Sequence, residues 1–201
     1  LQAVQVLAAV AVGNLGHLPI AEGLELPLRG DLGMNVFNSR ALLFLRELGL
    51  STAAVSFELR HQQIRDLKKV LRAEAIVYGR LPLMITENCL VQNETGCRLD
   101  RQGPCVPEDG PCRCGQPNVL VDRTGAAFPL LPAYGHRTEI QNSKPLYLAD
   151  RPEHRRLGLA YARLRFTTET AEECVSVVQN YLDAAPAAGD FTRGLYERGV
   201  E

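Results

Sequence analysis

The sequence has no excess of charge of either sign and no long apolar run. Its 201 residues include 22 Lys and Arg against 23 Asp and Glu, which gives a formal net charge of -1. So little net charge creates no overall field that gathers nucleic acid or an anionic membrane, so any such partner must be bound by a local patch. No stretch approaches the roughly 20 apolar residues that a transmembrane helix needs. We therefore expect a soluble, cytoplasmic protein that does not contact a membrane.

The start of the chain also lacks the marks of a targeting signal. Residues 1–12 are apolar, but they have neither the basic leader nor the clear small-residue cleavage site of a signal peptide. We interpret them as running into a buried strand. Because Leu1 is not an initiator methionine, we expect the sequence to be the later part of a longer protein. A hydrophobic content of 46% is sufficient for one sizeable core.

The first eighty or so residues alternate between apolar and amphipathic runs, and no internal repeat is visible. This alternation is typical of strand–helix units around a parallel sheet. We predict strands at 8–12, 33–37, 53–57 and 75–78, and helices at 40–48 and 60–72. The fold class is therefore α/β, as a partial TIM barrel or a doubly wound sheet, and both place functional groups at the C-terminal ends of strands. Polar residues near these ends are Asn14, Asn35, Asn38, Glu58 and Arg80.

Local signals mark the ends of two predicted helices. Asn38 or Ser39 can cap the start of the helix at 40–48, and Gly49 can supply the left-handed residue that ends it. Thr170 and Glu173 have the spacing of a capping box for a helix at 170–182. Further strands are expected at 144–149 and 159–166.

Residues 81–132 differ in character from the rest, with five of the six cysteines, many Gly and Pro residues and little periodicity before 119–121. We interpret this stretch as an inserted cysteine-rich loop module. The chain then divides into three parts. Residues 1–86 hold the later units of a TIM-barrel-like domain, 87–137 a cysteine-rich, cluster-binding module, and 138–201 a small α+β segment that closes the fold.

The cysteines of this module favour a metal or iron–sulfur site. Cys89, Cys97, Cys105, Cys112 and Cys114 fall within 26 residues. Their odd number fits disulfide pairing poorly, and thiols gathered in a reducing compartment more often bind metal. Zinc and iron–sulfur clusters both use four soft ligands, and the spacing alone leaves both open. The sixth cysteine, Cys174, is predicted to pack in the core as a small hydrophobic residue.

Six ordered stretches of the chain have unusual sequences. They are Gly30–Ser39, Val55–Leu59, Gly79–Cys89, Val121–Gly125, Glu139–Ser143 followed by Pro145–Asp150, and Phe191–Val200. Together they resemble the collagenase-like peptidase family U-32, and they cover nearly the whole chain. The resemblance implies the later strands of a TIM-barrel-like domain, an N-terminal half that lies outside this sequence, and an iron–sulfur site in the cysteine module.

The resemblance also implies which residues hold the cluster. Family members have a cysteine at the position of Cys89, others within 96–114, and a last one directly before the arginine that is Arg137 here. This chain has His136 at that last position, and imidazole can replace thiolate on a cluster iron. The expected ligands of a [4Fe–4S]-type cluster are Cys89, Cys112, Cys114 and His136, with Cys97 and Cys105 as alternates and zinc as the alternative metal.

The reaction implied by the family label is peptide hydrolysis. In the sequence we find no serine, histidine and acidic residue in an order that would indicate a nucleophilic triad. We also find no His-Glu-x-x-His motif, which would indicate a zinc hydrolase. Glu58 and Asn35 are the candidates for catalysis, although Glu58 and the nearby His61 also have an ordinary interpretation as a polar and a helix-surface residue. Arg193 and Arg198 are expected to bind substrate, because they belong to the family's terminal motif.

Two other functions stay open. The family resemblance also extends to bacterial proteins that hydroxylate bases of transfer or ribosomal RNA and depend on the cysteine cluster. Arginines that can meet phosphates are Arg151, Arg155, Arg156, Arg163 and Arg165, although a solvated basic surface is their ordinary interpretation. The third function is a non-catalytic, cluster-bearing scaffold. The expected partners are a peptide or RNA substrate and a partner subunit of the same family.

Overall fold

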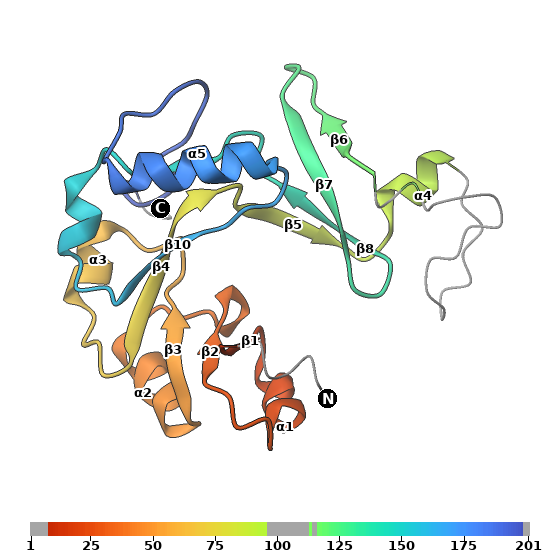
Figure 1. The fold of residues 1–201 in the computed structure, drawn as a ribbon. Helices are drawn as coiled ribbons and strands as arrows, with labels where there is room; N and C mark the ends of the chain where they lie inside the picture. Colours follow the sequence, from red (N-terminus) through yellow and green to blue (C-terminus); the bar gives the residue numbers. More distant parts are fainter. Residues whose placement is uncertain (1–7, 96–112, 114–115, 199–201) are drawn as a thin grey trace.

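The computed structural model describes residues 8–95, 113 and 116–198, and this part of the chain forms two β-sheets (Figure 1). In the larger sheet, parallel strands run in the order β1-β2-β3-β4-β10, and the short β9 pairs antiparallel with the end of β4. The smaller sheet is antiparallel, in the order β5-β8-β7-β6. The strands are β1 Val10–Val12, β2 Leu28–Gly30, β3 Leu50–Ala54, β4 Arg72–Gly79, β5 Pro82–Thr86, β6 Asn118–Val121, β7 Ala127–Ala133, β8 Arg137–Gln141, β9 Leu146–Tyr147 and β10 Tyr161–Leu164.

The helices are short, apart from α2 and α5. They are α1 Leu18–Ala21, α2 Ser39–Glu47, α3 His61–Asp66, α4 Leu90–Thr95 and α5 Ala171–Leu182, with 3-10 turns η2 Leu15–His17, η3 Leu32–Met34 and η5 Pro152–Arg156. The Asn38 side chain accepts a hydrogen bond from the Ala41 amide at 3.0 Å, which confirms the predicted cap of α2. The capping box of α5 is also confirmed. Among the described residues, no helix has the length and apolar character to cross a membrane.

Helices α2 and α3 cover one face of the parallel sheet. Leu42 and Leu45 of α2 and Ile64 of α3 are buried in one core with Ala53 of β3 and Ala73 of β4. Since successive side chains of a strand point to opposite faces, the next residues of these strands belong to the other face. The predicted α/β class is confirmed, and the parallel strand–helix units are compatible with part of a barrel.

The predicted strand at 33–37 is wrong. The strand of this unit is β2, at Leu28–Gly30, and η3 follows it. Asn35 ends η3 in the left-handed conformation, with φ 52° and ψ 54°. Such a residue interrupts an extended run, so Val36 makes only an isolated bridge with Val55.

Two other predicted elements are displaced or shortened. β3 begins at Leu50 and ends at Ala54, a few residues before the predicted strand at 53–57. Helix α3 ends at Asp66, whereas the prediction extended it to 72. β4 begins at Arg72, so the end of the predicted helix belongs to a strand.

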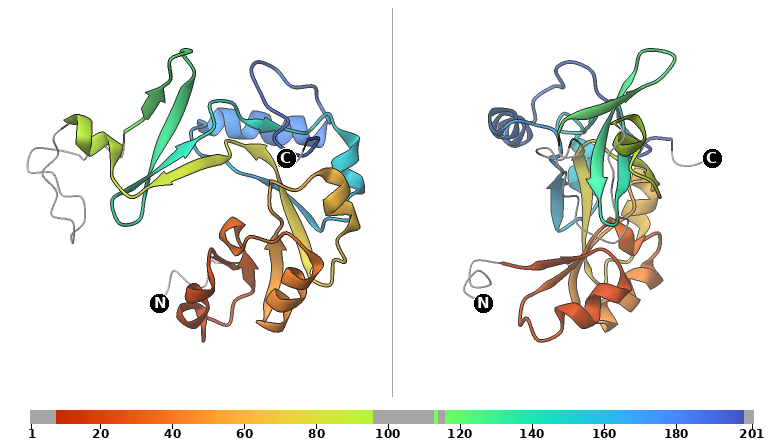
Figure 2. Two further views of the ribbon diagram at one scale, coloured as in Figure 1. Left: turned by 180° about the vertical axis from the view of Figure 1, so that it is seen from behind. Right: turned by 90° about the vertical axis from the view of Figure 1, so that its right-hand side faces the viewer.

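The predicted loop character of 81–132 is also wrong in part. β5, α4, β6 and β7 lie in this stretch, and three of them are strands of the antiparallel sheet. Figure 1 and the left view of Figure 2 show this sheet as an arm that projects from the parallel sheet. β5 pairs with β8, so residues before and after the cysteine segment lie side by side.

A polar junction joins the two sheets. Gln141, at the end of β8, is fully buried, and its side-chain oxygen accepts a hydrogen bond from Arg165 Nη1 at 2.7 Å. Arg165 Nη2 donates to Glu139 Oε1 at 2.7 Å, and Nη1 also donates to the Arg80 carbonyl at 2.7 Å. Arg165 therefore fixes the start of the arm against the ends of β4 and β10.

Candidate functional site

A buried carboxylate lies at the centre of the second face of the parallel sheet. Glu74 of β4 is 1% exposed. It accepts hydrogen bonds from Nη2 of Arg29 at 2.8 Å, from Nη2 of Arg163 at 2.8 Å and from the Thr52 hydroxyl at 3.3 Å. Arg163 also forms an ion pair with Asp31, which directly follows β2. One network of ion pairs and hydrogen bonds therefore joins β2, β3, β4 and β10, and Asp31, directly after β2, belongs to it as well.

Arg163 is held as a cation by this network. Burial alone would lower the pKa of its guanidinium. The hydrogen bonds and charges of Glu74 and Asp31 outweigh burial and raise that pKa above its ordinary value. Arg163 thus stays charged throughout the accessible pH range, and it links the end of β2 with β4 and β10.

Tyr161 of β10 borders the network, and its ring contacts Arg29 and one further cation, Arg72. The Cζ atoms of Arg29 and Arg72 lie 5.0 Å and 4.8 Å from the centroid of its ring. Among the described residues, Arg72 has no ion-pair partner besides this ring contact. Together with Arg163 this makes three guanidinium groups against the carboxylates of Glu74 and Asp31. This face therefore has one positive charge without a compensating carboxylate.

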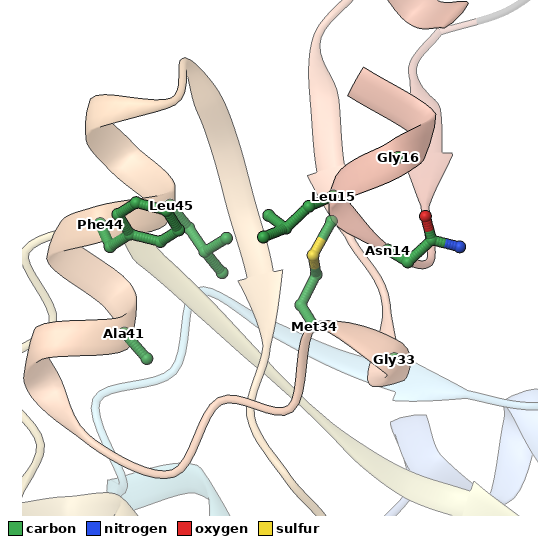
Figure 3. A pocket seen from close by; sticks show the side chains of 8 residues that line it. All are labelled: Asn14, Leu15, Gly16, Gly33, Met34, Ala41, Phe44 and Leu45. Atoms are coloured by element: carbon green, nitrogen blue, oxygen red, sulfur yellow. The ribbon is translucent and has the colours of Figure 1, made fainter. Parts of the chain in front are cut away.

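An apolar pocket of about 400 Å³ lies at the C-terminal ends of β1 and β2, between η2 and α2 (Figure 3). Leu15 and Phe44 line it from the two sides and are 49% and 48% exposed. Met34 and Leu45 also line it. Figure 3 shows the Asn14 side chain pointing away from these apolar side chains, and its amide nitrogen lies 3.1 Å from Nε2 of His17. The pocket can hold an apolar group, and the C-terminal ends of parallel strands are where barrel enzymes bind their substrates.

The structure brings Cys89 close to the turn that contains His136. Cys89 is 6% exposed and packs against Leu130 and Ile140 of the antiparallel sheet. Two residues before it, Glu87 forms an ion pair with Arg137, whose Nε lies 3.2 Å from the Glu87 carboxylate. His136 directly precedes Arg137, in the turn from β7 to β8, with φ 60°. Thr86 pairs with Thr138, whose hydroxyl accepts a hydrogen bond from the Leu90 amide at 3.1 Å, so strand pairing places this turn near the Cys89 loop and the exposed ion pair adds little.

Arg113 is anchored to the same sheet. The Asn118 side chain donates a hydrogen bond to the Arg113 carbonyl at 2.8 Å. Asn118 begins β6 and is in register with Leu130, which packs in the Cys89 cluster. The residue between Cys112 and Cys114 is therefore attached to the sheet on which Cys89 lies.

Comparison with known protein families identifies the family of this chain. Residues 2–121 match the model of peptidase family U32. The chain belongs to peptidase family U32. A search of curated proteins and a search of solved structures gave no match. The U32 match runs from β1 to β6, so it includes the pocket beside Phe44 and, apart from β10, the strands of the Glu74 network.

The two catalytic candidates of this U32 chain lie in the loops that follow β2 and β3. Asn35 is exposed in its left-handed turn after η3. Glu58 is half-buried in the turn after β3, where its amide donates to the Ser56 hydroxyl at 3.3 Å. Both flank the Val36–Val55 bridge that joins the two loops. Their role in catalysis stays a prediction.

The arginines expected to bind substrate have different surroundings. Arg193 pairs with Asp150 through two hydrogen bonds of 2.6 Å and 2.8 Å and donates to the Tyr147 carbonyl at 2.7 Å. The hydrogen bonds from Arg193 lower the pKa of the Asp150 carboxyl. Arg198 is exposed near the end of the described chain. Arg193 thus fixes the terminal segment to β9, and substrate binding by either residue stays a prediction.

The predicted metal ligands are only in part within the described residues. Cys89 and His136 are described, whereas Cys97, Cys105, Cys112 and Cys114 lie outside the described residues. Within the described ranges, no three His, Cys, Asp or Glu side chains are grouped so as to hold a metal ion. Cys174 on α5 is half-buried rather than fully packed in the core.

The sequence reasoning did not find Glu74. The signal was its position, since it is the one acidic residue within Arg72–Gly79, a strand that is otherwise buried and mostly apolar. A buried carboxylate needs a charged or hydrogen-bonding partner. Its partners are 45 and 89 residues away in sequence, on β2 and β10. They could not be identified without the strand order.

Proposed function

We propose that this U32 chain takes part in peptide hydrolysis and holds an apolar side chain of its substrate in the pocket beside Phe44. The observation that carries the proposal is the apolar pocket at the C-terminal ends of β1 and β2 (Figure 3). Leu15 and Phe44 are each about half exposed, so an apolar side chain placed between them would remove apolar surface of both from water. Family membership supports a peptide as that ligand.

The test uses the full-length protein that contains this chain and peptides that differ at one position. Phe44→Ala removes one wall of the pocket, and Val175→Ala, on an exposed part of α5, is the control. For a peptide with Leu or Phe at the variable position, we expect kcat/KM of Phe44→Ala to fall roughly tenfold, since lost apolar contact of this size is worth about 1–3 kcal/mol. For a peptide with Gly there, kcat/KM should not change. Absence of cleavage of every peptide would remove the proposal.

We further propose that the cysteine segment holds an iron–sulfur cluster, of the [4Fe–4S] type, with Cys89 and His136 among its ligands. The pairing of β5 with β8 supports this, because it places the His136 turn near the Cys89 loop. The apolar surroundings of Cys89 suit a thiolate that is shielded by a bound metal centre. Cys112 and Cys114 would complete the set from either side of Arg113. When bound, such a cluster supplies one-electron chemistry, and a histidine ligand raises its reduction potential.

The cluster is tested on protein purified without oxygen. We expect a brown protein with about four irons and acid-labile sulfide per chain, the composition of a [4Fe–4S] cluster. Cys89→Ala should lose the colour, and Cys174→Ala, which changes the cysteine outside the module, should keep it. His136→Cys should keep the cluster and lower its reduction potential. Stoichiometric zinc without sulfide would contradict the proposal.

Hydroxylation of an RNA base is the second candidate, and the closeness of Cys89 and the His136 turn favours it, since that reaction would use the cluster. RNA from wild-type and deletion strains distinguishes the candidates by mass spectrometry. A hydroxylase leaves one added oxygen on a base that is absent in the deletion strain. A scaffold without its own reaction leaves the RNA and every peptide unchanged and purifies together with its partner.

A further inference from the structure

Arg165 lies on the same face of the parallel sheet as the Glu74 network. It directly follows β10, and its amide donates to the Tyr78 carbonyl of β4 at 2.9 Å, so the pairing of the two strands continues to this residue. Successive side chains of a strand point to opposite faces. Arg163 belongs to the Glu74 network, whereas Leu164 packs with Tyr78 on the other face. The Arg165 side chain therefore shares the face of Arg163.

A bulge in β4 keeps an aromatic ring off this face. The strand has one extra residue, Val77, between its pairs with Arg163 and Leu164. In a regular strand Tyr78 would share the face of Glu74, which lies four residues before it. The bulge instead turns the Tyr78 ring to the opposite face, where it packs with Leu164. The room at the end of β4 on the Glu74 face is thus left for another side chain.

Two tyrosine hydroxyls from the C-terminal part of the chain hold this bulge. The Tyr196 hydroxyl donates to the Ile76 carbonyl at 2.6 Å, and the Tyr181 hydroxyl donates to the Val77 carbonyl. The register between β3 and β4 ends at Glu74, two residues before Ile76. Tyr196 is only 2% exposed, and a buried carbonyl that loses its hydrogen bond is costly. The two hydroxyls therefore stabilise the bulged form of β4.

Arg165 uses the room beside the bulge to cross the end of β4 and reach the arm. Its guanidinium donates to the Arg80 carbonyl, directly after β4, and to the side chains of Gln141 and Glu139 on β8, each at 2.7 Å. Gly79 permits this approach, because a Cβ there would lie 2.0 Å from the Arg165 carbonyl oxygen. The donors of a guanidinium form a rigid fork, so these bonds fix direction as well as distance.

Further strands of the sheet would leave these contacts in place. Such strands would pair with its outer strands, β1 and β10, whereas the bulge lies in β4 and Arg165 reaches inward across that strand. The arm begins directly after β4, at the C-terminal strand ends where barrel enzymes bind their substrates (Figure 1). The direction of the arm thus decides where Cys89 lies relative to those ends.

We infer that Arg165 and Tyr196 are positioning residues for the arm that carries Cys89. Tyr196 holds the bulge, and the bulge keeps the Tyr78 ring out of the path of Arg165. Arg165 then holds β8 in one direction from the parallel sheet. The inference rests on the proposed cluster and deepens it, since it names the residues that place the cysteine segment at the strand ends.

The experiment measures one distance between the arm and the parallel sheet of the full-length protein by pulsed electron paramagnetic resonance. Spin labels are attached through keto amino acids at two exposed positions, Arg123 in the β6–β7 turn and Glu47 of α2, so that no cysteine is labelled. We expect one narrow distance distribution. Arg165→Gln should broaden it and remove its single maximum, because the fork is lost. Arg137→Gln, which breaks an exposed ion pair of the arm, should leave it narrow.

Tyr196→Phe tests the connection through the bulge, because it removes the hydroxyl and keeps the ring. We expect a smaller broadening than in Arg165→Gln, and none in Tyr134→Phe, whose ring is 97% exposed. Since both residues act through one contact, the double variant should be no broader than Arg165→Gln alone. If Tyr196→Phe does not fold, Tyr181→Phe, which frees the Val77 carbonyl, takes its place.

A narrow distribution in Arg165→Gln or in Tyr196→Phe, or broadening that adds in the double variant, would overturn the inference. Urea unfolding of the same samples establishes that folded protein is measured. Iron and sulfide are determined in parallel. Their absence from the unsubstituted protein would remove the cluster proposal, while the distances would still decide whether these two residues position the arm.

Discussion

Glu74→Gln should destabilise the fold, although the substitution changes the shape of the side chain very little. Glu74 is buried and accepts hydrogen bonds from Arg29 and Arg163, whose side chains are 35% and 23% exposed. Removing one partner of a fully buried pair costs about 3–5 kcal/mol, and an exposed pair contributes at most about 1 kcal/mol. Because water reaches both arginines, we expect a loss of about 2–3 kcal/mol.

The assay is thermal and urea unfolding at neutral pH, with Glu22→Gln, at an exposed position, as the control. For a chain of this size the loss corresponds to a fall in Tm of about 4–12 °C. Arg163→Gln and the double variant complete a cycle, in which the two losses should not add, since they break the same ion pair. If Glu74→Gln has the same Tm and urea midpoint as the control, or if the two losses in the free energy of unfolding add, the carboxylate does not organise this face.

Other predictions follow from single contacts. Burial lowers the pKa of His61, which stacks on Tyr196 with a ring distance of 5.1 Å, so protonation opposes folding. Stability should fall as pH drops from about 6.5 through the lower folded pKa, and His61→Phe should reduce this fall in urea titrations. The hydrogen bonds from Arg193 lower the pKa of Asp150, so the stability lost in Asp150→Asn should be present above about pH 4 and vanish as pH falls through the folded pKa. A Cβ at Gly79 would lie 2.0 Å from the Arg165 carbonyl oxygen, so Gly79→Ala should prevent folding or cost more than about 3 kcal/mol in unfolding experiments. Gly125→Ala, where φ is 84° and the space is open, should cost only about 1 kcal/mol.

Local signals in the sequence predicted local structure well. The Asn38 cap and the Thr170–Glu173 box each depend on residues within one helical turn, and both are in place. The predicted strand at 33–37 failed because its apolar residues suited a strand, while Asn35 adopts the left-handed conformation and its amide donates to the Leu32 carbonyl at the end of η3. Propensity alone does not distinguish these outcomes.

Contacts between distant parts of the chain could not be predicted. The partner of Glu74 on β10 can be recognised only once β10 is known to lie beside β4. Likewise, the antiparallel sheet depends on the pairing of β5 with β8, which lie before and after the cysteine segment. Glu58 was placed correctly after β3, because the predicted strand there was displaced by only a few residues, whereas Asn35 was placed from a strand that does not form. The family resemblance, rather than any pattern of spacing, pointed to His136, which does lie beside the Cys89 loop.

The attachment of β8 at both ends has a consequence for how the length of this protein can vary. At one end the buried Thr138 hydroxyl accepts a hydrogen bond from the Leu90 amide beside Cys89, and Gln141 and Glu139 hold the other end to Arg165. Inserting one residue within β8 would turn every following side chain to the opposite face, so both attachments could not form together. The turn at Thr124 and Gly125 makes its hydrogen bonds locally, from Thr124 and Ala126 to the Asp122 carboxylate, and takes part in neither attachment. We expect natural variants to gain and lose residues in that turn while β8 keeps a constant length.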